Sequence, residues 1–334
     1  MRLTIAIPTV NRDYCIRRAV DSALRQTSRD VEILVSNNGS TDSTAEILES
    51  YSDARLRVYH HATTMPITDH GNFLMDQATG DLFVGLSDDD YLEPEFADKV
   101  LASFRRAPQV SFVYTRCWTH VRDAQLPSPA APELEDTVEF FENYFAGRRH
   151  LFWCACVTRT ADLRRLGGLP PGVMIGDMYF WTQLAFEGPV GCVSDLLSHY
   201  TYLVDNVSVG IPVCRWAHET RVLIERISTR LGGIAIAADR RQALSALMSR
   251  YLARTTANQF ALNASRGASK TALLGALLSC GRLLRSDVLT VAPRILASLL
   301  LPSFIMRRVV ARFAMSRSRW ARGTRARGGE PSPN

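Results

Sequence analysis

The stretch Leu82-Phe83-Val84-Gly85-Leu86-Ser87-Asp88-Asp89-Asp90-Tyr91-Leu92-Glu93-Pro94 begins as a short apolar run and then breaks into three consecutive carboxylates. The apolar part is typical of a buried strand. Three like charges at a strand end repel one another, and hard divalent cations, which prefer oxygen ligands, relieve that repulsion. Open α/β folds also bind ligands at the carboxyl edge of a parallel sheet. The alternative is a solvated acidic turn that caps the helix after Pro94.

Strands and helices are expected to alternate on both sides of this stretch. The hydrophobic pattern predicts strands at 3–7, 31–35, 56–59 and 82–86, and helices at 13–26 and 69–78. Such alternation is typical of a parallel, doubly wound sheet, so the fold class is predicted to be α/β.

Length and composition indicate one main domain with an appendage. The chain has 334 residues, of which 46% are hydrophobic, enough to bury a large core. The opening apolar run is broken by Pro8, so no secretory signal is expected. Seven scattered cysteines favour a reduced, cytoplasmic chain over a disulfide scaffold.

Several motifs, in the same order and spacing, resemble the opening of the family 2 glycosyltransferases. They are Pro8-Thr9-Val10-Asn11-Arg12, the run from Ala19 to Thr27, the run from Glu32 to Asp42, Asn72, Gly80-Asp81, and Leu86-Ser87-Asp88-Asp89-Asp90. The resemblance is strong over residues 1–100 and traceable to about 205. It implies a GT-A fold, which is Rossmann-like with flanking helices, a nucleotide-diphosphate-sugar donor, and Mg²⁺ or Mn²⁺ as cofactor.

The resemblance also assigns site residues one by one. Asp89 matches the family's metal-binding aspartate, and Asp88 beside it is expected to contact metal or ribose. Residues expected to bind the nucleotide sugar are Pro8, Thr9, Asn11, Arg12, Asn37, Asn72 and Asp88. The sequence departs from the family at Val10, at Ser87 and at Asn37, which stands near a base-reading aspartate. An amide can still contact a base, but uridine specificity does not follow.

Asp177 is the candidate general base. It stands after Gly176 at the start of an aromatic-rich helix. One interpretation is a helix N-cap. The resemblance implies instead that this carboxylate takes the proton of the acceptor hydroxyl, which is a poor nucleophile until then. His199 lies near where the family brings a histidine or arginine toward the donor phosphate or metal. Its alternative is a satisfied buried histidine.

The chain is predicted to divide into three regions: a catalytic domain at 1–210, a helical appendage at 211–285 and a basic tail at 286–334. Within the first region, 1–100 is expected to bind the nucleotide sugar and 101–210 to lie on the acceptor side. A loop at 123–132 with three prolines is expected to be mobile. Trp153 either stacks on a sugar or fills the core.

The tail carries the positive charge of the chain. Residues 301–334 contain eight arginines against Glu330 alone, while the whole chain has a net charge of +6. The preceding segment, Val288 to Met306, is apolar but interrupted by two prolines and an arginine, which makes a poor transmembrane span. It is expected to press against anionic lipid as an interfacial segment. The alternative is a core helix followed by a disordered tail.

These observations predict an inverting, metal-dependent glycosyltransferase at the cytoplasmic face of the cell membrane, acting on a saccharide or lipid-linked saccharide of a surface polysaccharide. A homodimer through the helical appendage is a further prediction. A sugar-nucleotide nucleotidyltransferase is the first alternative, but it would need a glycine-rich, basic loop after the first strand. The second is a nucleic-acid-binding protein, which would need basic residues throughout the nearly neutral body, so no nucleic acid partner is expected.

Overall fold

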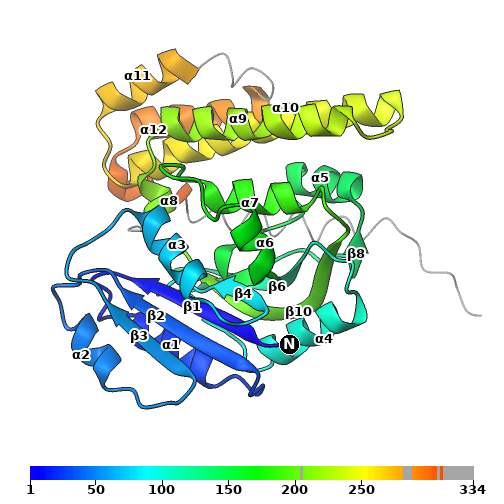
Figure 1. Cartoon of the computed structure of the whole chain (residues 1–334). Helices are drawn as coiled ribbons and strands as arrows, with labels where there is room; N and C mark the ends of the chain where they lie inside the picture. Colours follow the sequence, from blue (N-terminus) through cyan, green and yellow to red (C-terminus); the bar gives the residue numbers. More distant parts are fainter. Residues whose placement is uncertain (204–205, 281–287, 307–308, 311–334) are drawn as a thin grey trace, which may run out of the picture.

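The computed structural model describes residues 1–203, 206–280, 288–306 and 309–310. Within these residues a ten-stranded sheet forms the centre of the molecule, with the main strand order β3-β2-β1-β4-β9-β6-β10-β5 (Figure 1). The strands are β1 (Leu3–Thr9), β2 (Val31–Asn37), β3 (Leu56–His60), β4 (Leu82–Gly85), β5 (Tyr91–Leu92), β6 (Phe112–Val121), β7 (Ala124–Pro127), β8 (Leu134–Glu135), β9 (Cys156–Arg159) and β10 (Val190–Thr201).

The longest strand pairings are parallel. β1 pairs in parallel with β2 on one side and β4 on the other, and β2 pairs in parallel with β3. β6 and β10 form a second parallel pair, which the antiparallel strand β9 joins to β4. The predicted α/β class with a mostly parallel sheet is confirmed.

Helices cover both faces of the sheet (Figure 1). They are α1 (Ile16–Leu24), α2 (Thr44–Glu49), α3 (Ile67–Gln77), α4 (Phe96–Arg106), α5 (Thr137–Phe145), α6 (Thr160–Arg165), α7 (Gly176–Leu184), α8 (Val207–Gly210), α9 (Val213–Gly232), α10 (Ala238–Ser265), α11 (Lys270–Cys280) and α12 (Val288–Leu300). Successive side chains of β1 point to opposite faces of the sheet. Ile5 and Ile7 pack with α1 and α4, whereas Ala6 packs with α3, α5 and α7.

The chain beyond Pro212 is helical in its described part, as predicted. Helices α9 to α12 form a layer beside α5 and α7 (Figure 1), and α9 and α10 contribute to the same core as those two helices. None of the described helices is long and apolar enough to cross a bilayer. All eight arginines of residues 301–334 lie outside the described residues. The three predicted region boundaries stay predictions.

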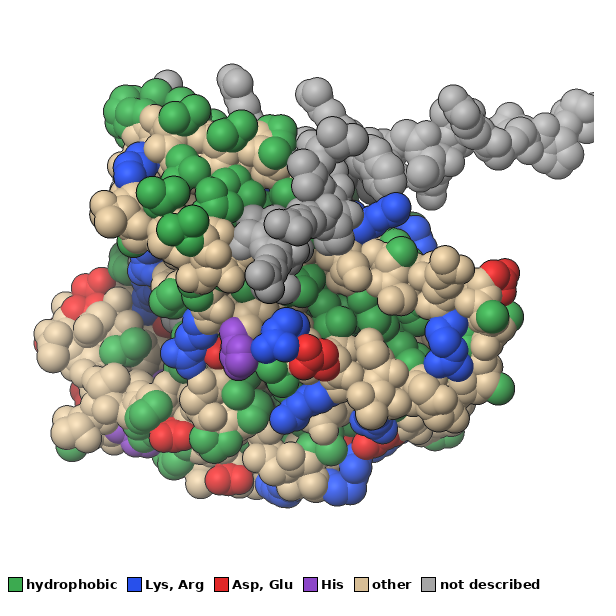
Figure 2. All heavy atoms as spheres, turned by 90° about the horizontal axis from the view of Figure 1, so that it is seen from above, with side chains coloured by type: hydrophobic (Ala, Val, Ile, Leu, Met, Phe, Trp, Pro, Cys, Tyr) green, Lys and Arg blue, Asp and Glu red, His purple; other side chains and the backbone are tan. Residues whose placement is uncertain are grey.

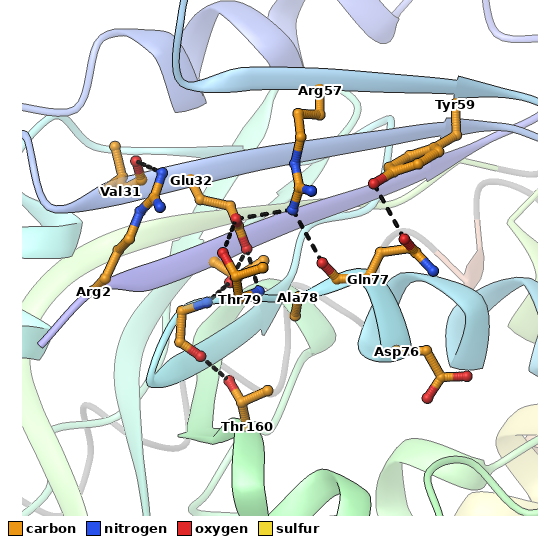
Figure 3. A network of polar contacts seen from close by, with 12 residues as sticks. Arg2, Val31, Glu32, Arg57, Tyr59, Asp76, Gln77, Ala78, Thr79 and Thr160 are labelled. Atoms are coloured by element: carbon orange, nitrogen blue, oxygen red, sulfur yellow. Dashed lines mark hydrogen bonds and ion pairs between the residues drawn. The ribbon is translucent and has the colours of Figure 1, made fainter.

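A buried carboxylate in β2 fixes the chain where it enters β4 (Figure 3). Glu32 accepts hydrogen bonds from Thr4 Oγ1 at 2.7 Å and from the Thr79 backbone at 2.7 Å, and it pairs with Arg57 at 3.0 Å. Burial alone would raise the pKa of Glu32, but the hydrogen bonds from Thr79 and Thr4 and the charge of Arg57 hold it below its usual range. The turn before β4, and with it the strand that leads to the three carboxylates, is therefore held from β1, β2 and β3.

The expectation of a mobile loop at 123–132 is wrong for its first half. Arg122 and Asp123 form a two-residue turn, and Arg122 has a φ of 53°. β7 then pairs antiparallel with β6, and buried Ser128 exchanges hydrogen bonds with Cys117 at 2.8 and 3.0 Å. Pro127 is compatible with this because it ends a strand at the sheet edge.

Candidate active site

Most of the predicted site residues of the first hundred positions lie at one edge of the sheet. Thr9 at the end of β1 lies opposite Asn37 at the end of β2, and β4 ends beside β1 with Gly85 opposite Ala6. Because these strands are parallel, their carboxyl ends share an edge, and the three carboxylates follow β4 there. The structure thus brings together residues that are far apart in the sequence.

The three carboxylates have different environments. Asp88 is half-buried, and its Oδ1 lies 3.6 Å from Nε of Arg12. Asp89 is buried, at 5% exposure. Asp90 is also buried, and its Oδ1 accepts a hydrogen bond from the backbone of Thr201 at 2.7 Å, which ties the acidic turn to the end of β10. The Asp90 carboxylate is therefore engaged within the fold, and metal binding by Asp88 and Asp89 stays a prediction.

Electrostatic repulsion within this turn is strong. Burial and the neighbouring Asp89 raise the pKa of Asp88 to about 7, against the smaller opposing effects of Thr9 and Arg12. Burial and the charges of Asp88 and Asp89 likewise raise the pKa of the Cys15 thiol to about 12. The Thr9 hydroxyl is buried and makes no hydrogen bond of normal geometry within the described residues. A cation at this turn would remove the cost of keeping both carboxylates ionised.

Two guanidinium groups flank the acidic turn. Arg12 faces Asp88, as described above. Arg18 in α1 donates from Nη2 to the backbone oxygen of Asp89 and, at 3.0 Å, to the Thr201 hydroxyl. Its guanidinium also lies 4.8 Å from the ring centre of Tyr91. Arginines placed on both sides of a carboxylate pair suit a ligand that brings both a metal and phosphate oxygens.

The predicted nucleotide-binding amides hold loops together. The backbone of Asn11, at a φ of 52°, donates to Ser40, and its side-chain oxygen accepts from Thr41, both at 2.8 Å. The buried Asn37 amide contacts His60 Nδ1 and the backbone of Ser40, each at 3.2 Å. These bonds shape the loops at the ends of β1 and β2, where the resemblance places the nucleotide.

Asn72 on α3 clamps the segment that leads to α7. Its amide nitrogen donates to the Leu169 carbonyl at 2.9 Å, and its oxygen accepts from the Leu169 backbone at 2.7 Å. Gly168, at a φ of 71°, leaves the space for this, since a Cβ there would lie 2.4 Å from the Asn72 oxygen. In this structure Asn72 positions a loop, and direct contact with a nucleotide sugar stays a prediction.

Asp177 lies in the first turn of α7 but is not its N-cap. The helix begins at Gly176 and the N-cap is Ile175, so the capping interpretation is wrong. The half-buried carboxylate accepts a hydrogen bond from the Met178 backbone at 2.8 Å. Burial raises the pKa of Asp177, while the backbone hydrogen bonds at the helix start oppose that rise. A carboxylate with a raised pKa is a stronger base, as proton abstraction from a hydroxyl requires.

Trp153 packs between α7 and the end of β4, the strand that leads into the acidic turn. A Cβ on Gly85 would lie 1.6 Å from the Trp153 indole nitrogen, so only glycine lets the ring sit against the end of β4. On its other side Trp153 contacts Trp181 of α7, with ring centres 6.1 Å apart. These contacts favour the core-filling interpretation of Trp153. The ring lies between the end of β4, which leads to Asp88, and the helix that carries Asp177.

Comparison with known proteins identifies the first half of the chain. The sequence profile described as "Glycosyl transferase family 2" matches residues 4–154. These residues form a family 2 glycosyltransferase domain. Chondroitin synthase of Pasteurella multocida is 35% identical over 115 residues, which are 34% of this chain and 12% of that protein. The chain therefore matches only a small part of the length of that curated relative.

Solved structures extend the likeness of the glycosyltransferase domain to nearly the whole chain. S. aureus TarS 1-349 in complex with UDP-GlcNAc aligns with a TM-score of 0.63 at 16% identity, covering 95% of this chain and 92% of that one. The mannosyltransferase PcManGT from Pyrobaculum calidifontis, in complex with GDP-Man and Mn²⁺, aligns at 0.52 and 20% identity, covering 89% and 85%. At these identities the likeness supports the fold alone, and it confirms the GT-A prediction.

His199 has protein partners on both ring nitrogens. Nε2 lies 2.8 Å from Glu93 Oε1 and Nδ1 lies 2.9 Å from His120 Nε2, while the ring stacks on Tyr91 at 4.0 Å. A metal bond would have to replace one of these hydrogen bonds. These contacts favour the alternative interpretation, in which His199 is a buried histidine with its hydrogen bonds satisfied. Metal binding by His199 stays a prediction that the geometry does not favour.

Proposed function

We propose that this chain is an inverting, metal-dependent glycosyltransferase that moves a sugar from a nucleotide-diphosphate donor to a saccharide acceptor, lipid-linked in the cell, during surface polysaccharide synthesis. The observation that carries the proposal is the pair Asp88 and Asp89, flanked by Arg12 and Arg18 at the strand ends of a family 2 domain. The bound UDP-GlcNAc and GDP-Man of the two structural relatives, and the polymer named for the chondroitin synthase, support donor and product class.

The residues of the acidic turn fit a divalent cation. Asp88 and Asp89 supply hard oxygen ligands, and their mutual repulsion is the cost that a cation would remove. A bound Mg²⁺ or Mn²⁺ supplies positive charge that stabilises the departing diphosphate. Arg12 and Arg18, both beside the turn, would hold the same phosphates in place.

Asp177 then has the role of general base. Its carboxylate accepts the proton of the acceptor hydroxyl while the hydroxyl oxygen attacks the anomeric carbon and the bond to the diphosphate breaks. A single displacement of this kind inverts the anomeric configuration. The sugar-nucleotide nucleotidyltransferase alternative is less well supported, because the loop after β1 is not glycine-rich and Arg12 is its one basic residue.

A nucleotide-binding experiment can identify the donor class without an activity assay. UDP, GDP, dTDP and CDP would be screened by thermal unfolding with Mn²⁺, with Mg²⁺ and with a chelator, and inorganic pyrophosphate would serve as the control. We expect one nucleotide to raise the unfolding temperature only when metal is present. A ligand at 100 times its Kd stabilises by about 2.7 kcal/mol, which is readily measured. The absence of stabilisation by every nucleotide in both metals would contradict the proposed function.

We also propose that the helical layer rests on the cytoplasmic face of the cell membrane. α11 exposes Leu274 and Leu278, α12 exposes Leu296 and Leu300, and Phe304 follows. Within each helix the leucines are four residues apart and share a face. Figure 2, which shows the molecule from the side of the helices, has apolar side chains gathered in one part of this face. The arginine-rich tail follows Phe304 in the sequence and provides the charge that anionic lipid attracts.

Truncation after Pro302 tests this membrane contact. Each arginine near an anionic surface contributes about 1 kcal/mol, which salt screens, so the shortened chain should no longer sediment with phosphatidylglycerol-containing vesicles at low salt. Nucleotide binding should be unchanged, because the site at the carboxyl ends of β1, β2 and β4 is built from the first hundred residues. Full vesicle binding by the shortened chain would support the core helix with a disordered tail instead.

A further inference from the structure

The start of α7 is held by a carboxylate from the helical layer. Glu219 lies on α9, 44 residues after Ile175. Its Oε2 accepts hydrogen bonds from the Met174 backbone at 3.0 Å and the Ile175 backbone at 3.2 Å. The Glu219 side chain is only 11% exposed, so this carboxylate is placed inside the protein to bind these two amides.

α7 has no capping side chain of its own. The first amides of a helix lack partners within the helix, and its N-terminus carries partial positive charge. The N-cap residue is Ile175, whose side chain cannot accept a hydrogen bond. Glu219 therefore provides, from a neighbouring helix, an acceptor for the amide of the N-cap residue and for the amide before it, and it places negative charge at the N-terminus of α7.

Arg215 also binds the segment that precedes α7. It lies one turn before Glu219 on α9, and its Nε donates to Glu219 Oε1 at 2.8 Å. Its Nη2 donates to the carbonyl of Gly172, which has a φ of 69°. From the other side, the Tyr179 hydroxyl of α7 donates to the Glu219 backbone oxygen at 3.4 Å. The segment 172–175 is thus held at three backbone positions by two side chains of α9.

We propose that Glu219, supported by Arg215, is a positioning residue for the general base. This proposal rests on the proposed role of Asp177, two residues after Ile175. The carboxylate must lie within hydrogen-bond reach of the acceptor hydroxyl, and a displacement of about 1 Å can lower a rate about 100-fold. The helical layer therefore takes part in catalysis by fixing the first turn of α7.

The first test replaces Glu219 by alanine and measures release of nucleoside diphosphate from the donor that the nucleotide screen selects, with water as acceptor. We expect kcat to fall about 10- to 100-fold with little change in the KM for donor, because the donor site is built from other elements. Glu219→Gln, whose side-chain oxygen can still accept both amide hydrogen bonds, should recover most of the rate. Glu225→Ala is the matched control, since Glu225 on the same helix is exposed and pairs with Arg221.

The second test separates this proposal from the role of Asp177. If Glu219 acts through Asp177, adding Glu219→Ala to Asp177→Asn should lower the residual rate less than twofold further. Multiplied effects of the two substitutions would overturn the positioning role while leaving Asp177 as base. A fully active Asp177→Asn variant would instead overturn the proposed mechanism. Should Glu219→Ala fail to fold, Arg215→Ala takes its place in both tests, and a wild-type kcat in that variant would refute the positioning proposal.

Discussion

Asp89→Asn is expected to abolish the metal-dependent part of nucleotide binding while the protein stays folded. Asparagine has nearly the same size as aspartate, so the buried space around residue 89 is filled as before. The substitution removes the negative charge that Asp88 now faces and leaves a single carboxylate in reach of the cation. Titration calorimetry of the selected nucleotide, in Mn²⁺ and in a chelator, measures the effect directly. The two titrations should become indistinguishable in the variant.

The exposed Asp76 on α3 offers the control for this experiment. Asp76→Asn removes the same charge from the surface, away from the acidic turn, and should bind nucleotide and metal like the wild-type protein. Thermal unfolding without ligand shows whether Asp89→Asn is folded. A folded Asp89→Asn variant that keeps the wild-type gain in affinity from Mn²⁺ would show that the acidic turn is not the metal site.

The sequence was sufficient to predict the part of the fold that carries the strand-edge site. Largely apolar runs placed β1, β2 and β4, which are buried on both faces. The edge strand β3, which contains Arg57 and is only partly buried, was predicted as well. The same patterns put Thr9, Asn37 and the three carboxylates at strand ends, and parallel pairing then brings strand ends together. Local pattern and global arrangement agree in this half of the chain, so the strand predictions hold there.

Residues that act through long-range contacts could not be found in this way. Arg18 lies on the exposed face of the amphipathic helix α1, where the sequence cannot distinguish it from a solvated surface charge. Glu219 has the same appearance on α9, since its partner Arg215 is one turn away and such pairs are common on helix surfaces. Only the packing of α9 against the start of α7 gives these charges a specific role.

The prediction of a loop failed for residues 124–127 because turn geometry outweighed composition. Three prolines suggested a loop, but each of them lies after the two-residue turn at Arg122 and Asp123. Proline is excluded from the centre of a sheet because it cannot donate a ladder hydrogen bond, but it is tolerated at an edge strand. The sequence before the turn, from Phe112 to Val121, is long enough to carry the extra strand.

Asp177→Asn is expected to lower the rate of sugar transfer by about two to four orders of magnitude. Asparagine can still accept the Met178 backbone hydrogen bond, so the start of α7 keeps its geometry. It cannot take a proton from the acceptor hydroxyl, however. Binding of the donor nucleotide should remain at the wild-type level, because Asp88, Asp89 and their arginines belong to other elements. Rates of nucleoside diphosphate release and affinity from calorimetry give the two quantities separately.

Stability supplies an independent control on this variant. Because burial raises the folded-state pKa of Asp177 above the ordinary value of about 3.9, its ionised form costs stability at neutral pH. Asp177→Asn should therefore be at least as stable as the wild-type protein at pH 7. Any gain should fade as the pH falls through the folded pKa and below the unfolded one, where both states are protonated. An inactive but unstable variant would not be evidence for a base.

The stereochemistry of the product tests the same residue without a substitution. If Asp177 activates the acceptor hydroxyl for direct attack, one bond to the anomeric carbon forms as the bond to diphosphate breaks, and the configuration inverts. Proton NMR of the first product, recorded before the free sugar equilibrates, distinguishes inversion from retention. Retention would require two displacements, in which a protein nucleophile, and not the acceptor hydroxyl, attacks the anomeric carbon first. Retention, or full activity of Asp177→Asn, would therefore refute the role of this carboxylate as the general base of a single displacement.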